Sequence, residues 1–213
     1  MRISGRWTAL LPILAILLFG PLLAVQRLGP LDFWWGMSFS LAVLITLAFL
    51  TDKPLRLSLL QDLKSGLSKK FSLGFLSALA LYGVFWVGNA VSRAALPLAD
   101  KEIGAVYGFK QDADIIRIGL LILIVIGPGE EIFWRGFLQR RWQRSLGSPL
   151  GWLLAAGFYA AVHAGSGNLI LLLSALVCGL YWGAIFTRFQ SVVMVAVSHT
   201  VWDILIFIIF PLR

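Results

Sequence analysis

Three apolar stretches of this chain place polar side chains one helical turn apart. Their chemistry-bearing residues are Glu130, Glu131 and Arg135, then Tyr159 and His163, then His199 and Asp203. An ionisable group at the centre of a bilayer costs at least about 2.5 to 3.5 kcal/mol, so it usually has a partner or a task inside the protein. A carboxylate or an imidazole can take a proton from water, and an imidazole N–H can stabilise developing negative charge. The stretches therefore predict polar groups that are partnered or functional inside the membrane.

The first stretch predicts two glutamates with different roles. At about 100° per residue, Glu131 and Arg135 share a helix face and favour a charge-assisted pair. Glu130 points about 100° away, which leaves it available as a base. Pro128 and its flanking glycines are expected to loosen the helix just before the glutamates.

The two histidine stretches each allow two interpretations. Tyr159 and His163 share a helix face, yet a lone histidine on an apolar helix is more often a satisfied core residue than a catalytic one. His199 and Asp203 also share a face, where the aspartate can orient the imidazole. The alternative is an interhelical hydrogen bond that fixes packing and contributes about 1 kcal/mol.

The composition predicts that membrane-spanning helices position these residues. The 213 residues are 59% hydrophobic and 13% charged, with a mean hydropathy of +0.88. A membrane crossing needs roughly 20 apolar residues, so an all-α polytopic bundle of about seven spans is expected, forming a single integral membrane domain over 1–213. The expected spans are Thr8–Val25, Phe33–Leu50, Leu73–Val91, Ile116–Arg140, Leu150–Ala164, Leu169–Thr187 and Ser191–Phe210.

Depth along these spans tests whether the polar residues can meet. At about 1.5 Å per residue, Glu130 lies about 20 Å from the outer edge and about 15 Å from the inner one. His163, His199 and Asp203 lie about 20, 12 and 18 Å from the cytoplasmic edge. All four residues therefore fall in one central slab, which favours a shared function over separate packing roles.

Charge predicts the orientation of the chain. Of the 18 Lys and Arg, twelve, including Arg2, are expected on the side of the membrane where the N-terminus lies. The other six, including Arg213, are expected on the opposite side. Excess Lys and Arg mark the cytoplasmic side, so the N-terminus is expected inside and the C-terminus outside. The acidic segment Ser92–Asp114, which includes Asp112, would face outward. Because the basic residues stand at the ends of apolar segments, a nucleic-acid partner is not expected.

Three smaller features complete the sequence picture. The N-terminal run lacks a convincing cleavage site, so it is interpreted as a retained first span and not a signal peptide. The single cysteine, Cys178, is expected in the core and excludes an intrachain disulfide. The nine tryptophans, several near predicted span ends, are expected to be interfacial anchors.

The three motifs in this order are a more specific signal than any one of them. Glu-Glu-x-x-x-Arg, aromatic-x-x-x-His and His-x-x-x-Asp resemble the CAAX protease and bacteriocin-processing (CPBP, or Abi) family of intramembrane proteases. The resemblance covers about Gly127 to Asp203 and implies a catalytic core at about 115–210. Tyr159 stands where phenylalanine is usual, and Asp203 where asparagine is frequent. A small chain without an extra domain resembles a bacterial plasma-membrane member.

The resemblance also implies roles. Glu130 would be the general base that activates water, with His163 assisting, and His199 and Asp203 would form the oxyanion site. Glu131, Arg135 and Tyr159 would be structural or supporting. An ionised Asp203 would repel the oxyanion unless it is protonated or only orients His199.

The family was long described as metalloproteases, so zinc is the alternative cofactor. His163, His199 and Glu130 could bind it. The chain has no His-Glu-x-x-His helix, the stronger zinc signature, so glutamate-dependent hydrolysis without a cofactor is favoured.

Two other functions remain open at this stage. Intramembrane Glu, His and Asp also form proton relays in transporters. Inverted repeats would favour a transporter, and none is visible in the sequence. A non-catalytic relative that binds a protein, as in bacteriocin immunity, is the second alternative, and the full set of polar positions speaks against it. The expected partners are the lipid bilayer and a membrane-anchored protein or peptide substrate of the CAAX, leader or sorting-tail kind.

Overall fold

The computed structural model describes residues 4–111 and 113–212 of the chain. Arg2, Asp112 and Arg213, which entered the charge prediction, lie outside this range. Within it the chain is helical apart from connecting turns and one small hairpin, in which β1 (Arg27–Leu28) pairs antiparallel with β2 (Leu31–Asp32). The expected all-α class is confirmed.

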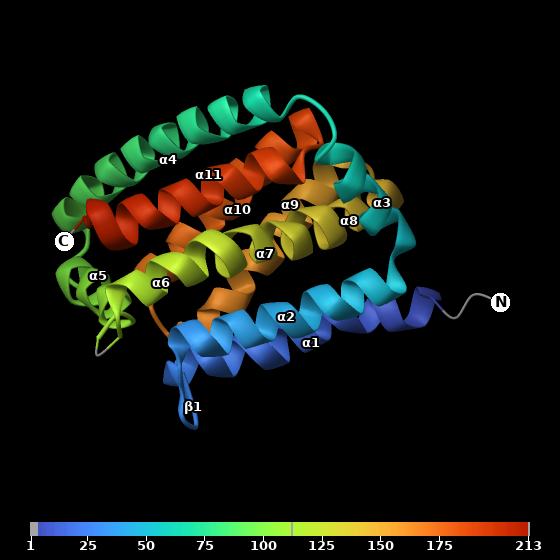
Figure 1. Cartoon of the computed structure of the whole chain (residues 1–213). Helices are drawn as coiled ribbons and strands as arrows, with labels where there is room; N and C mark the ends of the chain where they lie inside the picture. Colours follow the sequence, from blue (N-terminus) through green and yellow to red (C-terminus); the bar gives the residue numbers. More distant parts are fainter. Residues whose placement is uncertain (1–3, 112, 213) are drawn as a thin grey trace.

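The helices follow the predicted spans and add short ones between them (Figure 1). The α-helices are α1 (Ser4–Val25), α2 (Phe33–Thr51), α3 (Lys53–Asp62), α4 (Leu67–Ala95), α5 (Ala99–Gly108), α6 (Ile115–Leu121), α7 (Gly127–Glu131), α8 (Arg140–Leu146), α9 (Ser148–His163), α10 (Leu169–Phe189) and α11 (Val192–Ile204). Three π-helical segments, η1 (Ile122–Ile126), η2 (Ile132–Gln139) and η4 (Leu205–Ile209), and one 3₁₀ turn, η3 (Ala164–Ser166), extend or link them. Helices α3 and α5 were not among the predicted elements.

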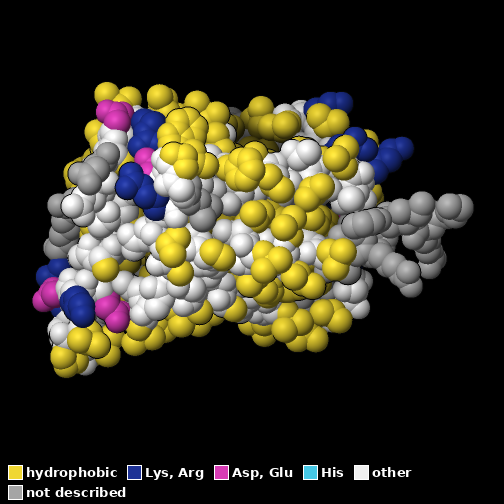
Figure 2. All heavy atoms as spheres, turned by 90° about the horizontal axis from the view of Figure 1, so that it is seen from below, with side chains coloured by type: hydrophobic (Ala, Val, Ile, Leu, Met, Phe, Trp, Pro, Cys, Tyr) yellow, Lys and Arg dark blue, Asp and Glu magenta, His cyan; other side chains and the backbone are white. Residues whose placement is uncertain are grey.

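Four helices in the described part of the chain are long and apolar enough to cross a membrane. They are α2, α4, α10 and the continuous segment Val192–Ile209. Figure 2 shows hydrophobic side chains over the middle of one face and charged side chains gathered at its two ends, as a bilayer requires. Helix α9 has 16 residues, or about 24 Å, so it is shorter than a full crossing. The number of about seven spans therefore stays a prediction.

The helix that carries the glutamates lies in the middle of the bundle. In Figure 1, α6, α7 and α8 run end to end between the α4 and α11 pair on one side and the α1 and α2 pair on the other, with α9 and α10 behind. Helix α11 packs against both α4 and α7. The polar residues of the central helix are therefore enclosed by neighbouring helices, as their cost in lipid demands.

A carboxylate fixes the start of the helix that bears His199. Ser191 caps α11 by accepting a hydrogen bond from Met194 N at 3.1 Å. Asp62 Oδ2 accepts from Val193 N at 2.9 Å and from Ser191 Oγ at 3.2 Å. Lys70 Nζ lies 2.8 Å from the other Asp62 oxygen. Negative charge at a helix N-terminus is stabilising, so this cluster holds α11 against α3 and α4.

Gly127 sets the distance between the central helix and α11. A Cβ added at Gly127 would clash with Thr200 Oγ1 and would lie 3.0 Å from Thr200 Cα. We expect Gly127→Ala to push α7 from α11 and to destabilise the protein by about 1 to 3 kcal/mol, measured by thermal unfolding in detergent. Gly83→Ala is the matched control, because a Cβ there meets nothing within 4 Å. Equal unfolding midpoints for the two variants would contradict this close approach.

Candidate active site

The central helix changes its winding on both sides of the two glutamates. Segment η1 ends immediately before Gly127, whose N–H bonds to Ile122 O five residues back, and η2 begins directly after Glu131. The next residue, Pro128, has no N–H to donate, which fits the expected loosening at this point. Wide π-turns inside helices are frequent at functional sites. Here they present Glu130 and Glu131, 4% and 0% exposed, to the interior of the bundle.

Glu131 has two partners. Its Oε1 accepts hydrogen bonds from Arg135 Nη1 at 2.8 Å and from His199 Nδ1 at 2.7 Å. The ion pair with Arg135 is the one that the four-residue spacing predicts. The bond to His199 joins the central helix to α11 and was not predicted. Glu131 is therefore a support of His199 as well as the counter-ion of Arg135.

Arg135 is enclosed by aromatic rings. Its guanidinium carbon lies 4.8 Å from the ring centroid of Tyr159 and 5.4 Å from that of Trp182. Its Nη2 also donates to Cys178 O at 3.4 Å, and the side chain is 2% exposed. Rings at this distance stabilise a cation that has left water. Tyr159 therefore lies in a supporting position beside the ion pair.

His199 is held on three sides. Nδ1 donates to Glu131, Nε2 lies 3.5 Å from Asp203 Oδ2, and the imidazole stacks on Trp182 with centroids 3.8 Å apart and planes at 23°. Because the Nδ1 proton is committed to Glu131, Nε2 of a neutral ring is an acceptor. His199 can donate from Nε2 only when the ring carries both protons.

His163 stands at the C-terminal end of α9 with one nitrogen committed. Its Nδ1 donates to Tyr159 O at 2.8 Å, and the two rings lie 4.7 Å apart, so the predicted common face is present. A neutral His163 therefore keeps an acceptor lone pair on Nε2. The side chain is partly exposed, unlike the buried His199.

Glu130 is the carboxylate without a described hydrogen bond. Its Oε2 is buried and, like Oε2 of Glu131, has no hydrogen-bond partner in the described part of the chain, but Glu131 is bound through its other oxygen. Glu130 is close enough to His163, His199 and Tyr159 to interact with each of them electrostatically. A buried polar atom without a partner is costly, and a catalytic role or a bound water is one explanation for it. The structure thus brings the predicted residues of three helices together around Glu130.

The residues named for a zinc site do not form one. Among the residues that the structure describes, no three His, Cys, Asp or Glu side chains are arranged to hold a metal ion. Both histidines use Nδ1 for another hydrogen bond, so Nε2 is the nitrogen that each could offer to a metal ion. In the described part of the chain, His163, His199 and Glu130 are therefore not grouped as ligands of a single ion, and the absence of a cofactor stays a prediction.

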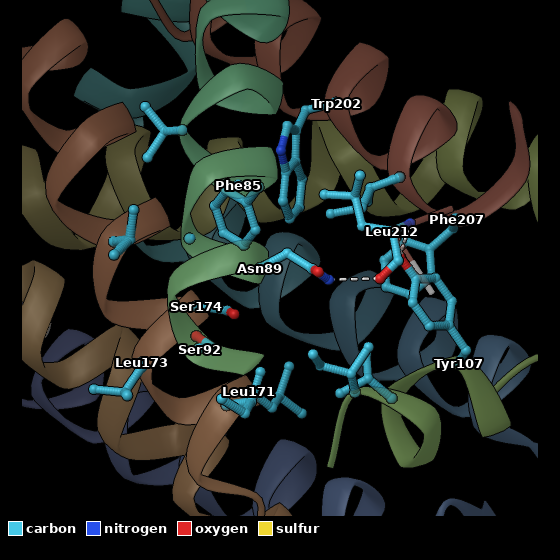
Figure 3. A pocket seen from close by; sticks show the side chains of 17 residues that line it. Phe85, Asn89, Ser92, Tyr107, Leu171, Leu173, Ser174, Trp202, Phe207 and Leu212 are labelled. Carbon is cyan, nitrogen blue, oxygen red and sulfur yellow. Dashed lines mark hydrogen bonds between the residues drawn. The ribbon is translucent and has the colours of Figure 1, made fainter. Parts of the chain in front are cut away.

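Two open pockets lie beside this centre. One, of about 210 Å³, is enclosed by α4, α5, α10 and α11, and Figure 3 shows Trp202 and Phe85 on its wall and the hydrogen bond from Asn89 to Leu212 O. The other, of about 1140 Å³, lies between α3 and α4 on one side and α7 and α11 on the other. Pro128 and Thr200 line the larger pocket, each close in sequence to a glutamate or histidine of the site.

Sequence reasoning missed Trp182 and Ser198. The tryptophans were expected at the membrane interface, but Trp182 is 0% exposed and lies against His199, so that expectation is wrong for this residue. Ser198 accepts a hydrogen bond from Trp182 Nε1 at 3.1 Å. Only the position of Ser198 next to His199 could have suggested it, because nothing in the spacing links Trp182 to α11.

Comparison with known proteins agrees with the motifs. Residues 112–205 match the family model described as type II CAAX prenyl endopeptidase Rce1-like. No curated protein and no solved structure matches the chain. The matched segment contains all seven motif residues and ends just beyond Asp203. Residues 112–205 are therefore similar to the Rce1-like branch of the CPBP family, the family that the three motifs resemble.

Proposed function

We propose that this protein hydrolyses a peptide bond of a membrane-anchored protein or peptide, with Glu130 as the base that activates water. The observation that carries the proposal is the buried Glu130 carboxylate, which has an oxygen without a partner in the described chain and interacts electrostatically with His163. A carboxylate held within reach of a water molecule can take a proton from it as a general base. The match of residues 112–205 to a protease family model supports the same reaction class.

The reaction would run in two steps. Glu130 takes one proton from a water held between its carboxylate and Nε2 of His163, and the water oxygen forms a bond to the scissile carbonyl carbon. The carbonyl oxygen becomes an oxyanion, which His199 Nε2–H would stabilise. The carbon–nitrogen bond then breaks, and Glu130 returns its proton to the leaving amine, which leaves the enzyme unchanged.

Donation by His199 requires a doubly protonated ring, and its surroundings favour that form. Glu131 faces one ring nitrogen at 2.7 Å and Asp203 faces the other at 3.5 Å. Two flanking carboxylates stabilise an imidazolium more than a neutral imidazole. We assign Asp203 the role of orienting and balancing His199, so it does not itself touch the oxyanion.

We further propose that no metal takes part. The support is the arrangement of the side chains, in which no three metal-binding groups of the described chain are placed to hold one ion. Full activity after exhaustive chelation is the expected result. Loss of activity that added zinc restores would overturn this part of the proposal.

The larger pocket offers a route from the lipid to the site. Its walls are apolar apart from a few residues such as Arg56, and it includes aromatic side chains from α2 and α4, among them Phe49, Phe71 and Phe75. An apolar groove of this kind suits a substrate that arrives within the membrane. We propose that prenylated CAAX termini, leader peptides or sorting tails reach Glu130 by this route. We also propose a bacterial plasma membrane with the N-terminus in the cytoplasm.

The test is a comparison of membrane-protein termini in cells with and without this protein, followed by cleavage in liposomes. We expect new termini that depend on the protein. The purified wild type should cleave the identified substrate, whereas Glu130→Ala, His163→Ala and His199→Ala should cleave it at least about 10²-fold more slowly. Unchanged cleavage by all three variants would sink the protease assignment.

A further inference from the structure

We propose that Trp182 is a positioning residue that sets the plane of the His199 ring, and that Ser198 anchors Trp182 in this role. The proposal rests on the proposed function, because His199 is assigned there to the oxyanion. Trp182 is on α10, outside the three motifs, and no part of the mechanism above uses it. The stacked pair of rings and the hydrogen bond of the indole carry the proposal.

The hydrogen bond to Glu131 does not by itself fix the His199 ring. A single Nδ1–H···O bond lets the imidazole pivot about that line, so Nε2 can swing away from the substrate carbonyl. The Trp182 ring lies 3.8 Å from the imidazole at 23°, which removes this pivot by steric contact. With Glu131 and Trp182 both in place, the imidazole ring is held in one orientation, and its Nε2 atom points in one direction. Catalytic donors must hold such a direction closely, because small displacements cost large factors in rate.

Trp182 is itself held from several sides. Its Nε1 donates to Ser198 Oγ, and Ser198 Oγ lies 2.8 Å from Ser77 Oγ of α4. Tyr181, the preceding residue, donates to Ser77 O at 2.8 Å. Trp202 meets the Trp182 ring edge-on at 5.5 Å. Trp202 also packs on Phe85 of α4, and Figure 3 shows these two rings. Helices α4, α10 and α11 thus fix the indole beside the turn that carries His199.

Two substitutions separate the ring face from the N–H anchor. Trp182→Phe keeps an aromatic face but loses the donor to Ser198, and Trp182→Leu removes the face while keeping apolar volume. We expect Trp182→Leu to lower kcat by about 10- to 100-fold with little change in KM. Trp182→Phe should restore kcat to within about 3-fold of the wild type, because the stacked face persists.

Trp34→Leu is the matched control for loss of a buried indole. Trp34 is 3% exposed, donates Nε1 to Phe109 O at 2.9 Å and makes edge contacts with Phe33 and Phe207. It therefore shares burial, a hydrogen bond and aromatic packing with Trp182, but it has no described contact with His199. We expect Trp34→Leu to lower thermal stability about as much as Trp182→Leu while kcat stays near that of the wild type.

A measurement without substrate separates this proposal from the proposed function. The chain has only two histidines, so ¹⁵N and ¹H spectra of histidine-labelled protein in detergent report His163 and His199 alone. Trp182→Leu should shift the His199 ring signals and leave those of His163 in place, and Trp34→Leu should shift neither. If no substrate is cleaved but these shifts appear, the proposed function fails while the positioning of the ring stands.

A double-mutant cycle completes the test. If Trp182 acts through His199, Trp182→Leu should have no further effect on kcat in a His199→Ala background. An undiminished effect there, or unchanged His199 signals in Trp182→Leu, would overturn the proposal.

Discussion

Glu130→Gln should lower kcat by about 10²- to 10⁴-fold, the range that a general base contributes. The amide has nearly the same shape as the carboxylate but cannot take a proton from water. No described hydrogen bond of Glu130 is lost, so the variant should fold as the wild type does. Cleavage of the identified substrate in liposomes, with thermal unfolding in parallel, measures both effects.

The neighbouring glutamate provides the control. Glu131→Gln makes the same chemical change one residue away, but Glu131 accepts from Arg135 and from His199. We expect that variant to lose stability, which Glu130→Gln should not. A Glu130→Gln protein that cleaves at the wild-type rate would refute the assignment of the base. Equal stability losses in both variants would refute the division of roles between the two glutamates.

The local part of this site could be predicted from sequence because helix geometry fixes it. The Glu131–Arg135 pair and the Tyr159–His163 contact both follow from a spacing of four residues. The expectation that Glu130 and the histidines meet came from depth along the spans, which depends only on rise per residue. Neither argument requires knowledge of how the helices pack against one another.

The contacts between helices could not be predicted in the same way. The hydrogen bond from His199 to Glu131 joins residues 68 apart in sequence, and it depends on the rotation of α11 about its axis. The stacking of Trp182 on His199 depends in addition on the register of α10. Tryptophan residues in general prefer the membrane interface. This preference does not predict that an individual indole, such as that of Trp182, is buried among helices. Such contacts are also the ones that decide which histidine nitrogen is free.

Arg135→Met should be the most destabilising single change at this site. It removes the partner of a carboxylate that is 0% exposed and leaves charge in the protein interior. Breaking one side of a buried ion pair typically costs about 3 to 5 kcal/mol. The loss of the ring contacts with Tyr159 and Trp182 adds to this. Thermal unfolding in detergent should show a large fall in the midpoint, and an unchanged midpoint would contradict a buried ion pair here.

The double variant Glu131→Gln with Arg135→Met separates two roles of the ion pair. One role is its contribution to protein stability, and the other is the support that Glu131 gives to a protonated His199. With both charges gone, no unpaired charge of this pair remains buried, so most of the lost stability should return. Activity should not return, because the substituted amide carries no charge to favour the second proton on His199. An oxyanion donor lost in this way costs about 10²- to 10³-fold in kcat. A double variant that is stable and fully active would show that His199 needs no carboxylate at Nδ1, and the imidazolium mechanism would then be wrong.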